Sequence, residues 1–517
     1  MPRQVRRSSR TPRVPAACPL CIPCSPRRLP PRIPRVGRNL RRGGLLVLLT
    51  VLCRPAAAAD APYYPAEIPA LRKADFIFFS NAVFAEPANE KEARKRAVQI
   101  DFIRRFRICL TNGYANFAGE ELDDLHAAGC EFFIYRWFNG FYVRELPAES
   151  DRGRETDFIS SYPEIARMHR EIHAHPDWLL NHSRPIQGGG ASEPAWFFDY
   201  GNPEFRRYYV AAIQRDLAAA RYDGVFFDYI GGWALPAEIK PLFNEKHPGQ
   251  TYDDAGILFL RELRAAIGTQ KIFGNQAYRL PEAYYDLIDY DATESHATSF
   301  VWGKEASLFL EGQGVKSVLD TFVREWDGPN GCQEIARQSR AMSAAKPRVK
   351  VCDINYLQPR RVPTGASAEV GGRRTPVFSE RTDRPSIFYS YVVSKLHNAA
   401  AFASDWYCPG HGQDDVYFLD LGEPLDGDYV EHPDAVVRYF KNGFVVLTRR
   451  NGRVVFAPDA KYLPEDLQGV WDVYEGIAVH DWPVRRSVTI DPAWYPSTRS
   501  HYPSGRVYMF LRNSPAK

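Results

Sequence analysis

Two acidic positions in this sequence could act together on one bond. Asp228 ends the run 222–229 (YDGVFFDY), where a turn dipeptide leads into apolar residues. Glu294 lies in the segment 290–296 (YDATESH), and Asp291 in the same segment is a rival for its role. Hydrolysis of a glycosidic bond needs such a pair, because one carboxyl group protonates the leaving oxygen while the other acts as nucleophile or activates water.

The surroundings of these acids favour that chemistry over simpler roles. We expect burial of Glu294 among Tyr290, Phe300 and Trp302 to raise its pKa, as the role of a general acid requires. The simpler roles are a helix cap for Glu294 and a helix cap or salt bridge for Asp228. We therefore predict Asp228 as nucleophile or base and Glu294 as general acid, with Asp291 as the alternative acid.

Further polar and aromatic residues fall near the expected strand ends. Sugar rings present C–H faces that stack on aromatic side chains, and their hydroxyls bind amides and charged groups. The candidate substrate-binding residues are Arg136, Trp137, Asp199, Tyr229, Trp233, Asn275, His296, Trp302, Asp405 and Trp406.

Short apolar runs that alternate with helical stretches must position these residues. The eight runs are 75–80, 107–111, 131–136, 224–228, 271–275, 287–291, 349–354 and 400–405. Strand–helix alternation implies parallel pairing through crossover helices, and eight repeats fit a closed barrel better than an open sheet. The sequence therefore predicts an α/β fold, a (β/α)8 TIM barrel with its polar residues at the carboxyl ends of the strands.

Several helices carry clear end signals. Asn202-Pro203-Glu204 supplies a cap, a first-turn proline and an acidic first turn for a helix that leads to the fourth strand. A second helix is expected over 254–267, ending at Gly268. The segment 137–199 is too long for a simple loop, and we expect this insertion to build part of the substrate site.

After about residue 410 the pattern changes to short strands and turns. The runs 416–421, 444–448, 453–457, 487–490 and 506–511 are strand-like, and Asn442-Gly443 and Asn451-Gly452 are hairpin turn signals. We predict a small antiparallel β-sandwich after the barrel. The expected domains are 1–59, a basic extension with a secretory signal; 60–409, the barrel; and 410–517, the β domain.

The charge of the chain is unevenly distributed. Residues 1–59 contain 13 arginines and no acidic residue, so the rest carries 53 basic against 62 acidic residues. This excess of negative charge argues against a nucleic-acid partner. Arginines before the apolar core 45–53, followed by Ala57-Ala58-Ala59, indicate a secretory signal too short to span a bilayer. We expect a secreted or periplasmic protein with no stable membrane insertion after cleavage.

No metal or cofactor is predicted. Cys18, Cys21 and Cys24 resemble half of a metal site, but no second half follows. The first strand ends Phe79-Ser80-Asn81, without the paired histidines of a metal-dependent hydrolase. No serine-nucleophile elbow, zinc-protease helix or dinucleotide fingerprint occurs. Cleavage leaves five cysteines, an odd number, whose pairing the sequence does not give.

These motifs resemble those of TIM-barrel glycoside hydrolases. Asn202-Pro203 with its helix, then 222–228 (YDGVFFD), is most similar to the fourth-strand region of families near endo-α-polygalactosaminidases and the α-galactosidase clan. The segments 420–424 (DLGEP) and 438–443 (RYFKNG) are similar to the β domain that those barrels often carry. The resemblance implies a catalytic aspartate at the fourth strand, which maps onto Asp228, and a sixth-strand carboxylate, which maps onto Glu294 or Asp291.

We therefore expect a glycosidase that cleaves a poly- or oligosaccharide. Two alternatives remain. A catalytically inactive barrel would bind glycan through its aromatic residues, and a metal-dependent polysaccharide deacetylase would lose its activity with a chelator.

Overall fold

A computed structural model gives the structure of this protein. It describes residues 68–512, except for 70, 72, 80–95, 98–99, 102, 112–118, 144–162, 188–193, 312–313, 328–330, 357–358, 383, 398–414, 450–451, 480–485 and 496–499. The predicted extension and signal over 1–59 lie outside the described residues.

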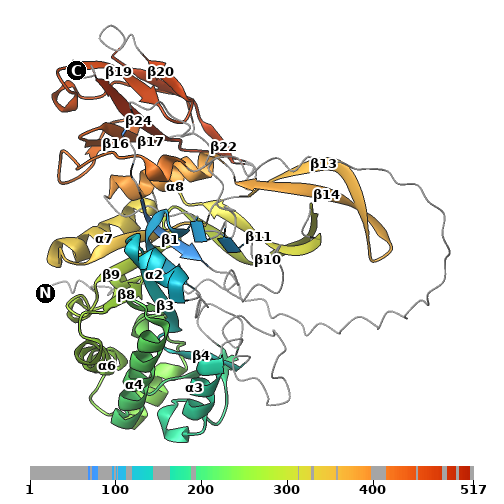
Figure 1. Cartoon of the computed structure of the whole chain (residues 1–517), viewed down its shortest axis with the longest axis vertical. Helices are drawn as coiled ribbons and strands as arrows, with labels where there is room; N and C mark the ends of the chain where they lie inside the picture. Colours follow the sequence, from blue (N-terminus) through green and yellow to red (C-terminus); the bar gives the residue numbers. More distant parts are fainter. Residues whose placement is uncertain are drawn as a thin grey trace, which may run out of the picture.

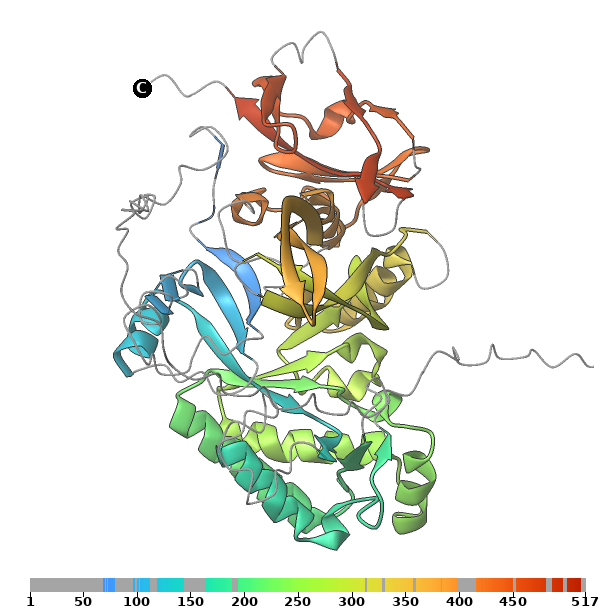
Figure 2. The same ribbon diagram turned by 90° about the vertical axis from the view of Figure 1, so that its right-hand side faces the viewer.

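A curled sheet of seven parallel strands forms the centre of the molecule (Figures 1 and 2). Its strands are β1 (Ala74–Phe79), β2 (Phe106–Thr111), β3 (Glu131–Trp137), β7 (Gly224–Asp228), β8 (Lys271–Asn275), β9 (Tyr290–Glu294) and β12 (Lys350–Ile354). Each strand pairs in parallel with the next one in this order. This sequential order is that of a TIM barrel, so the predicted fold class is confirmed. The expected eighth strand, 400–405, lies outside the described residues.

One strand boundary was predicted wrongly. The sixth strand is Tyr290–Glu294 and not 287–291. Leu287 and Ile288 are buried, but they belong to a turn before the strand. The correction matters for function because Glu294 now ends the sixth strand, as Asp228 ends the fourth.

The inside of the barrel is filled in layers from the amino to the carboxyl ends of the strands. At the amino end, Lys271 Nζ lies 2.5 Å from a Glu131 carboxylate oxygen, and Tyr290 Oη donates to the other oxygen at 2.9 Å. The aromatic rings of the next layer pack edge to face around Phe273, with Phe133 at 5.5 Å and Phe226 at 5.3 Å between ring centres. Side chains alternate along a strand, so the next inward positions form the layer at the carboxyl end.

Helices cover the outside of this sheet. They are α2 (Gly119–Ala127), α4 (Pro203–Ala220), α5 (Ile239–Lys246), α6 (Tyr252–Ile267), α7 (Cys332–Ala345) and α8 (Arg384–Leu396). The helix α4 begins as predicted, because the Asn202 side chain accepts hydrogen bonds from two first-turn N–H groups. The helix α6 ends at Gly268 as predicted, but it begins two residues earlier, after a capping box formed by Thr251 and Asp254.

The insertion after β3 forms a small subdomain beside the carboxyl ends of the strands. It contains β4 (Gly140–Tyr142), α3 (Pro163–His173), the 3-10 helix η3 (Pro176–Trp178), β5 (Ile186–Gln187) and β6 (Pro194–Phe197). Its strands pair antiparallel in the order β4-β6-β5.

A second insertion was not predicted from the sequence. The hairpin of β10 (Thr298–Leu310) and β11 (Gly314–Val323) follows β9, and the hairpin of β13 (Pro359–Val370) and β14 (Arg373–Thr382) follows β12. Together they form a sheet in the order β11-β10-β14-β13. The β13–β14 hairpin projects away from the barrel (Figure 1).

The C-terminal part is an antiparallel β domain that packs on α8 (Figures 1 and 2). Its main sheet has the order β15-β16-β17-β24-β19-β20, and β18 pairs with β21. These strands are β15 (Val430–Glu431), β16 (Ala435–Phe440), β17 (Gly443–Thr448), β18 (Val454–Phe456), β19 (Leu467–Asp472), β20 (Ile477–Val479), β21 (Val488–Ile490) and β24 (Gly505–Arg512); a small hairpin joins β22 (Ala493–Tyr495) and β23 (Ser500–Tyr502). The expected strand 416–421 is wrong, because its first residues lie in the 3-10 helix η7 (Asp415–Phe418).

Four of the five expected cysteines can be placed. Cys109, Cys130, Cys332 and Cys352 are buried free thiols, and Cys408 lies outside the described residues. Over the described part of the chain, no helix has both the length and the apolar character needed to cross a membrane.

Candidate active site

The carboxylate of Asp228 sits at the carboxyl end of β7, facing the inside of the barrel. Its Oδ2 accepts a hydrogen bond from Tyr135 Oη of β3 at 2.6 Å. Its Oδ1 accepts one from Asn275 Nδ2 and one from the backbone N–H of Tyr229, both at 2.8 Å. Three donors directed at one carboxylate stabilise its charged form.

The carboxylate of Glu294 sits two strands away, at the end of β9. Its Oε1 accepts a hydrogen bond from Tyr356 Oη at 2.5 Å, and its Oε2 accepts one from Asn275 Nδ2. Asn275 ends β8, the strand between the two acids, so its amide nitrogen donates to both carboxylates. Both acidic residues are partly exposed, which leaves them accessible from the end of the barrel.

The surroundings of Asp228 and Glu294 shift their pKa values in the same direction but for partly different reasons. Burial raises the pKa of Asp228, and its three donors oppose this shift. Burial and the negative charge of Asp228 raise the pKa of Glu294 to about 7. Asp228 accepts three hydrogen bonds and Glu294 two, so the charged form of Asp228 is the better stabilised of the pair. The arrangement can therefore hold one carboxylate and one carboxylic acid together near neutral pH.

The three strands that carry Asp228, Asn275 and Glu294 are each followed by a residue with left-handed backbone. The residue after Asp228, Tyr229, has φ 53°, and the residues after Asn275 and Glu294, Gln276 and Ser295, have φ 55° and 58°. Among described residues other than glycine, only Arg221, at the end of α4, shares this left-handed conformation. Left-handed backbone is costly for residues with a Cβ and persists only where the surroundings fix it.

An acidic side chain contacts the segment that follows each of these three strands, twice at a backbone N–H group and once at a histidine ring. Asp253 accepts a hydrogen bond from Gly232 N at 2.8 Å after β7, and Asp291 accepts one from Ala277 N at 2.6 Å after β8. After β9, Asp353 Oδ2 lies 2.8 Å from the Nδ1 of His296.

Asp291 thus lies apart from the Asp228–Glu294 pair. It faces the helices, where its second oxygen also accepts a hydrogen bond from Thr293 Oγ1 at 3.1 Å. Burial raises its pKa to about 7 as well, but its carboxylate is directed at the backbone after β8.

Two aromatic residues, Trp137 and Tyr229, lie next to Asp228. Trp137, at the end of β3, stacks on Tyr142 at 4.4 Å and meets Tyr229 edge to face at 5.6 Å between ring centres. Trp233, which follows β7 in the 3-10 helix η4 (Gly232–Ala234), lies 4.9 Å below the guanidinium of Arg279. Trp302 lies within β10.

Three other predicted binding residues lie on the outside of the barrel. Arg136 is buried and ion-pairs with Asp216 of α4 at 2.5 Å. Asp199 is buried at the start of α4, with His247 Nε2 at 2.7 Å. His296 is buried behind the sheet with Asp353. Asp405 and Trp406 lie outside the described residues.

Sequence reasoning missed the two tyrosines, Tyr135 and Tyr356. The two-residue period of a strand could have found the first, because Phe133 and Tyr135 must face the same way and Arg136 the opposite way. Tyr356 lies beyond the end of β12, and no local pattern indicates its contact with Glu294. Among described residues, no group of three or more His, Cys, Asp or Glu side chains is arranged to hold a metal ion.

Residues 151–310 match the model of hypothetical glycosyl hydrolase family 15. The matched segment contains β7, β8 and β9, and therefore Asp228, Asn275 and Glu294. Together with the parallel barrel, this match confirms the resemblance to TIM-barrel glycoside hydrolases and the class of glycosidase. No curated protein matches the chain.

Several solved structures resemble this chain at low identity. The glycoside hydrolase domain of PelA from Pseudomonas aeruginosa is 12% identical, with a TM-score of 0.37 over 64% of this chain and 94% of that one. An α-amylase from Malbranchea cinnamomea is 12% identical, with a TM-score of 0.43 over 85% and 96%. An α-galactosidase from Thermus thermophilus is 12% identical, with a TM-score of 0.35 over 72% and 65%.

Proposed function

We propose that this protein is a secreted glycoside hydrolase that cleaves O-glycosidic bonds of a poly- or oligosaccharide with Asp228 as nucleophile and Glu294 as general acid and base. One observation carries the proposal: the Asn275 amide nitrogen donates to both carboxylates at once. Two acids facing a common space, one charged and one protonated, are what the reaction needs.

The shared amide also favours one stereochemical course. A hydrogen bond spans about 3 Å, so two oxygens bound to one nitrogen lie no more than about 6 Å apart. Retaining glycosidases separate their carboxyl groups by about 5–5.5 Å, and inverting ones by about 6.5–9.5 Å. The closer spacing leaves little room for a water between the acid and the sugar, and we propose retention of configuration.

The reaction then proceeds in two steps. An oxygen of Asp228 attacks the anomeric carbon while Glu294 gives its proton to the leaving oxygen, which breaks the glycosidic bond and forms a glycosyl ester. Glu294, now a carboxylate, takes a proton from water as the water oxygen attacks the same carbon. This step releases the sugar, frees the Asp228 carboxylate and restores the protonated acid.

The neighbouring side chains support these roles. Tyr135 and Asn275 stabilise the Asp228 carboxylate before it attacks. The buried ring of Trp137 stacks on Tyr142, and a sugar face could pack against the partly exposed ring of Tyr142.

Release of reducing ends from a panel of purified glycans tests the proposal on the full-length protein. Asp228→Asn should lower the rate by at least about a thousandfold, because it removes the nucleophile but keeps the size of the side chain. Asp472→Asn is the matched control, since Asp472 is a buried carboxylate of the β domain far along the chain from the barrel strands. Unchanged activity of Asp228→Asn would remove Asp228 from the mechanism. Glycan binding by the native protein without release of reducing ends would favour the inactive barrel, and loss of activity with a chelator would favour the deacetylase.

A further inference from the structure

The chain changes face abruptly after Glu294. Thr293 pairs in register with Asp353 of β12, and Glu294 pairs with Ile354, so Thr293 and Asp353 share the outer face of the sheet. His296 follows Glu294 by two residues and would share its inward face in a continued strand. Instead, its Nδ1 lies 2.8 Å from Asp353 Oδ2 on the outer face. The left-handed Ser295 between them makes this reversal possible.

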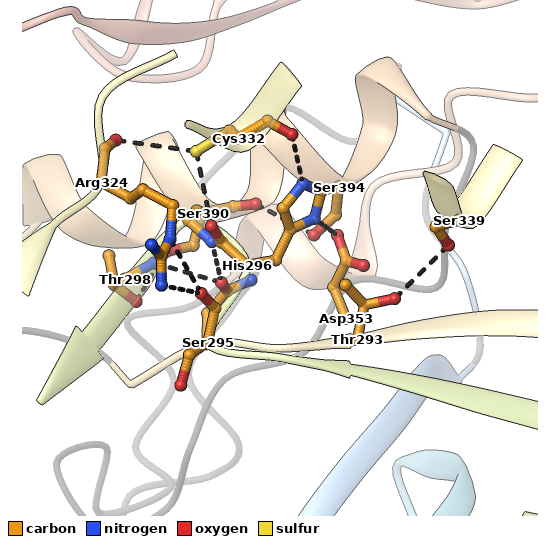
Figure 3. A network of polar contacts seen from close by, with 12 residues as sticks. Thr293, Ser295, His296, Thr298, Arg324, Cys332, Ser339, Asp353, Ser390 and Ser394 are labelled. Carbon is orange, nitrogen blue, oxygen red and sulfur yellow. Dashed lines mark hydrogen bonds and ion pairs between the residues drawn. The ribbon is translucent and has the colours of Figure 1, made fainter. Parts of the chain in front are cut away.

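Hydrogen bonds hold the backbone of the reversal on both sides of Ser295 (Figure 3). Ser295 N donates to the carbonyl of Ile354 at 2.7 Å, which extends the pairing with β12. The carbonyl of Ser295 accepts from the Arg324 guanidinium, from Nε at 3.3 Å and Nη2 at 3.1 Å.

The His296 ring is fixed at both nitrogens. Its Nε2 lies 3.1 Å from the carbonyl oxygen of Cys332, which can only accept, so this nitrogen carries a hydrogen. Its Nδ1 lies 2.8 Å from Oδ2 of Asp353. His296 and Asp353 are each about 1% exposed, so neither touches substrate. Figure 3 shows the ring between Cys332, the first residue of α7, and Asp353.

The same segment also holds the hydrogen-bond partner of Glu294. The backbone N–H groups of Ala297 and Thr298 donate to Asn355 Oδ1 at 2.7 and 3.3 Å. Asn355 is fully buried and precedes Tyr356, whose hydroxyl donates to Glu294. The ends of β9 and β12 are therefore tied together behind the site, with Glu294 on one and Tyr356 on the other.

We propose that His296 and Asp353 are positioning residues for catalysis, which hold the left-handed turn at Ser295 and thereby fix the Glu294 carboxyl against Tyr356 and Asn275. The assignment rests on the proposed role of Glu294 as the acid. At the other two strand ends, Asp253 and Asp291 contact the segment after the strand directly, by accepting hydrogen bonds from the backbone N–H groups of Gly232 and Ala277. If His296 and Asp353 had only a structural role, they would stabilise the barrel without affecting the position or the pKa of the Glu294 carboxyl.

The decisive experiment is an infrared titration of the Glu294 carboxyl in the full-length protein, which needs no substrate. The carboxyl signal is isolated by subtracting the spectrum of the same protein carrying Glu294→Gln. The charged and titratable groups facing this carboxyl are Asp228, Tyr229 and Tyr356. In the native protein the midpoint should lie near pH 7. Asp353→Asn should move it by at least half a pH unit, while the control Asp472→Asn leaves it in place.

Kinetics on a cleaved glycan give the second measurement. Asp353→Asn should lower kcat about 10- to 100-fold with little change in KM, because a misplaced acid slows chemistry more than binding. Ser295→Val, which disfavours the left-handed backbone, should reproduce this loss, and Ser295→Gly should lose less. A drop in thermal stability with an unmoved midpoint and unchanged kcat would overturn the proposal. If the native protein cleaves no glycan, the proposed function fails, and the titration alone still decides the positioning role.

Discussion

Asp228 and Glu294, which lie 66 positions apart in the chain, accept hydrogen bonds from the same amide nitrogen. Asn275 supplies that nitrogen from the intervening strand, and a tyrosine hydroxyl holds each carboxylate on its other oxygen. Each donor can be removed alone, so its effect on the two acids can be measured separately.

Asn275→Ala should impair catalysis more than a simple loss of packing would. Without the shared donor, Glu294 keeps only the hydrogen bond from Tyr356 against the charge on Asp228, so the pKa of Glu294 should rise further. We expect kcat/KM to fall by about a hundredfold, measured as a pH–rate profile. Asn442→Ala, in the turn between β16 and β17, is the matched control, and an equal loss in both variants would contradict this role.

The native pH profile should fall on the alkaline side near pH 7. Glu294 must be protonated to act as the acid, and its pKa lies at about 7, so activity is lost as the pH rises through that value. Tyr356→Phe removes a donor from the charged form of Glu294 and should move this limb up by about one pH unit. Tyr135→Phe removes a donor from Asp228 and should raise the acidic limb instead. Movement of the same limb in both variants would disprove the assignment of acid and nucleophile.

Glu294→Gln should stabilise the protein at alkaline pH. The same substitution removes the proposed general acid. A folded-state pKa of about 7, above the ordinary glutamate value of 4.5, means that the folded protein loses stability as the pH rises between these values. The difference in unfolding free energy between the variant and the native protein should therefore grow by about 1–3 kcal/mol from pH 4.5 to pH 8 in favour of the variant. This range allows for the partial exposure of Glu294. Urea unfolding at both pH values checks this, and an equal difference between the two proteins at both would refute the shifted pKa.

Asp291→Asn separates the two acids that the sequence left as rivals. Its carboxylate holds the backbone after Asn275 and does not face Asp228, so we expect only about a tenfold loss of kcat. Glu294→Gln, measured beside it on a substrate with a poor leaving group, should lose about a hundredfold or more. If Asp291→Asn lost more activity than Glu294→Gln while keeping its fold, Asp291 would be the acid.

Arg136→Met should affect stability and leave substrate binding unchanged. Removing one partner of a buried ion pair leaves Asp216 without its counter-charge and should cost about 3–5 kcal/mol of unfolding free energy. The double variant with Asp216→Leu should recover much of that loss, while KM stays at its native value in both. A raised KM in the single variant, without the loss of stability, would restore Arg136 as a binding residue.

The sequence predicted six of the seven described barrel strands to within one residue at each end, because their apolar pattern is local. The run 224–228 is apolar on both faces, and its single polar residue falls at the carboxyl end. The sixth strand was misplaced because its true sequence, YDATE, contains polar residues on both faces. Their burial is tolerable only because Asp291 meets backbone N–H groups and Glu294 meets Tyr356, and these are contacts between distant segments.

The second feature that could not be predicted from the sequence was the side of the sheet on which a side chain lies. Arg136, His296 and Asp199 carry types of side chain that bind sugars, but their side chains lie among the helices. For Arg136 the strand period indicates the outward face, whereas for His296 the left-handed Ser295 reverses what the period predicts. No sequence signal marks a serine as left-handed, so the location of His296 could be learned only from the structure.

The helix α8 shares the apolar core of the barrel strands and is covered by β17 and β24 of the β domain. Ser386 through Val393 are all buried, and one continuous apolar core joins α8, the barrel strands and residues such as Val445 and Met509. The two modules should therefore melt in a single cooperative transition, and neither should survive dissection from the other. Swapping the β domain for a foreign one would strip a flank of α8 and expose the apolar side chains that it now covers.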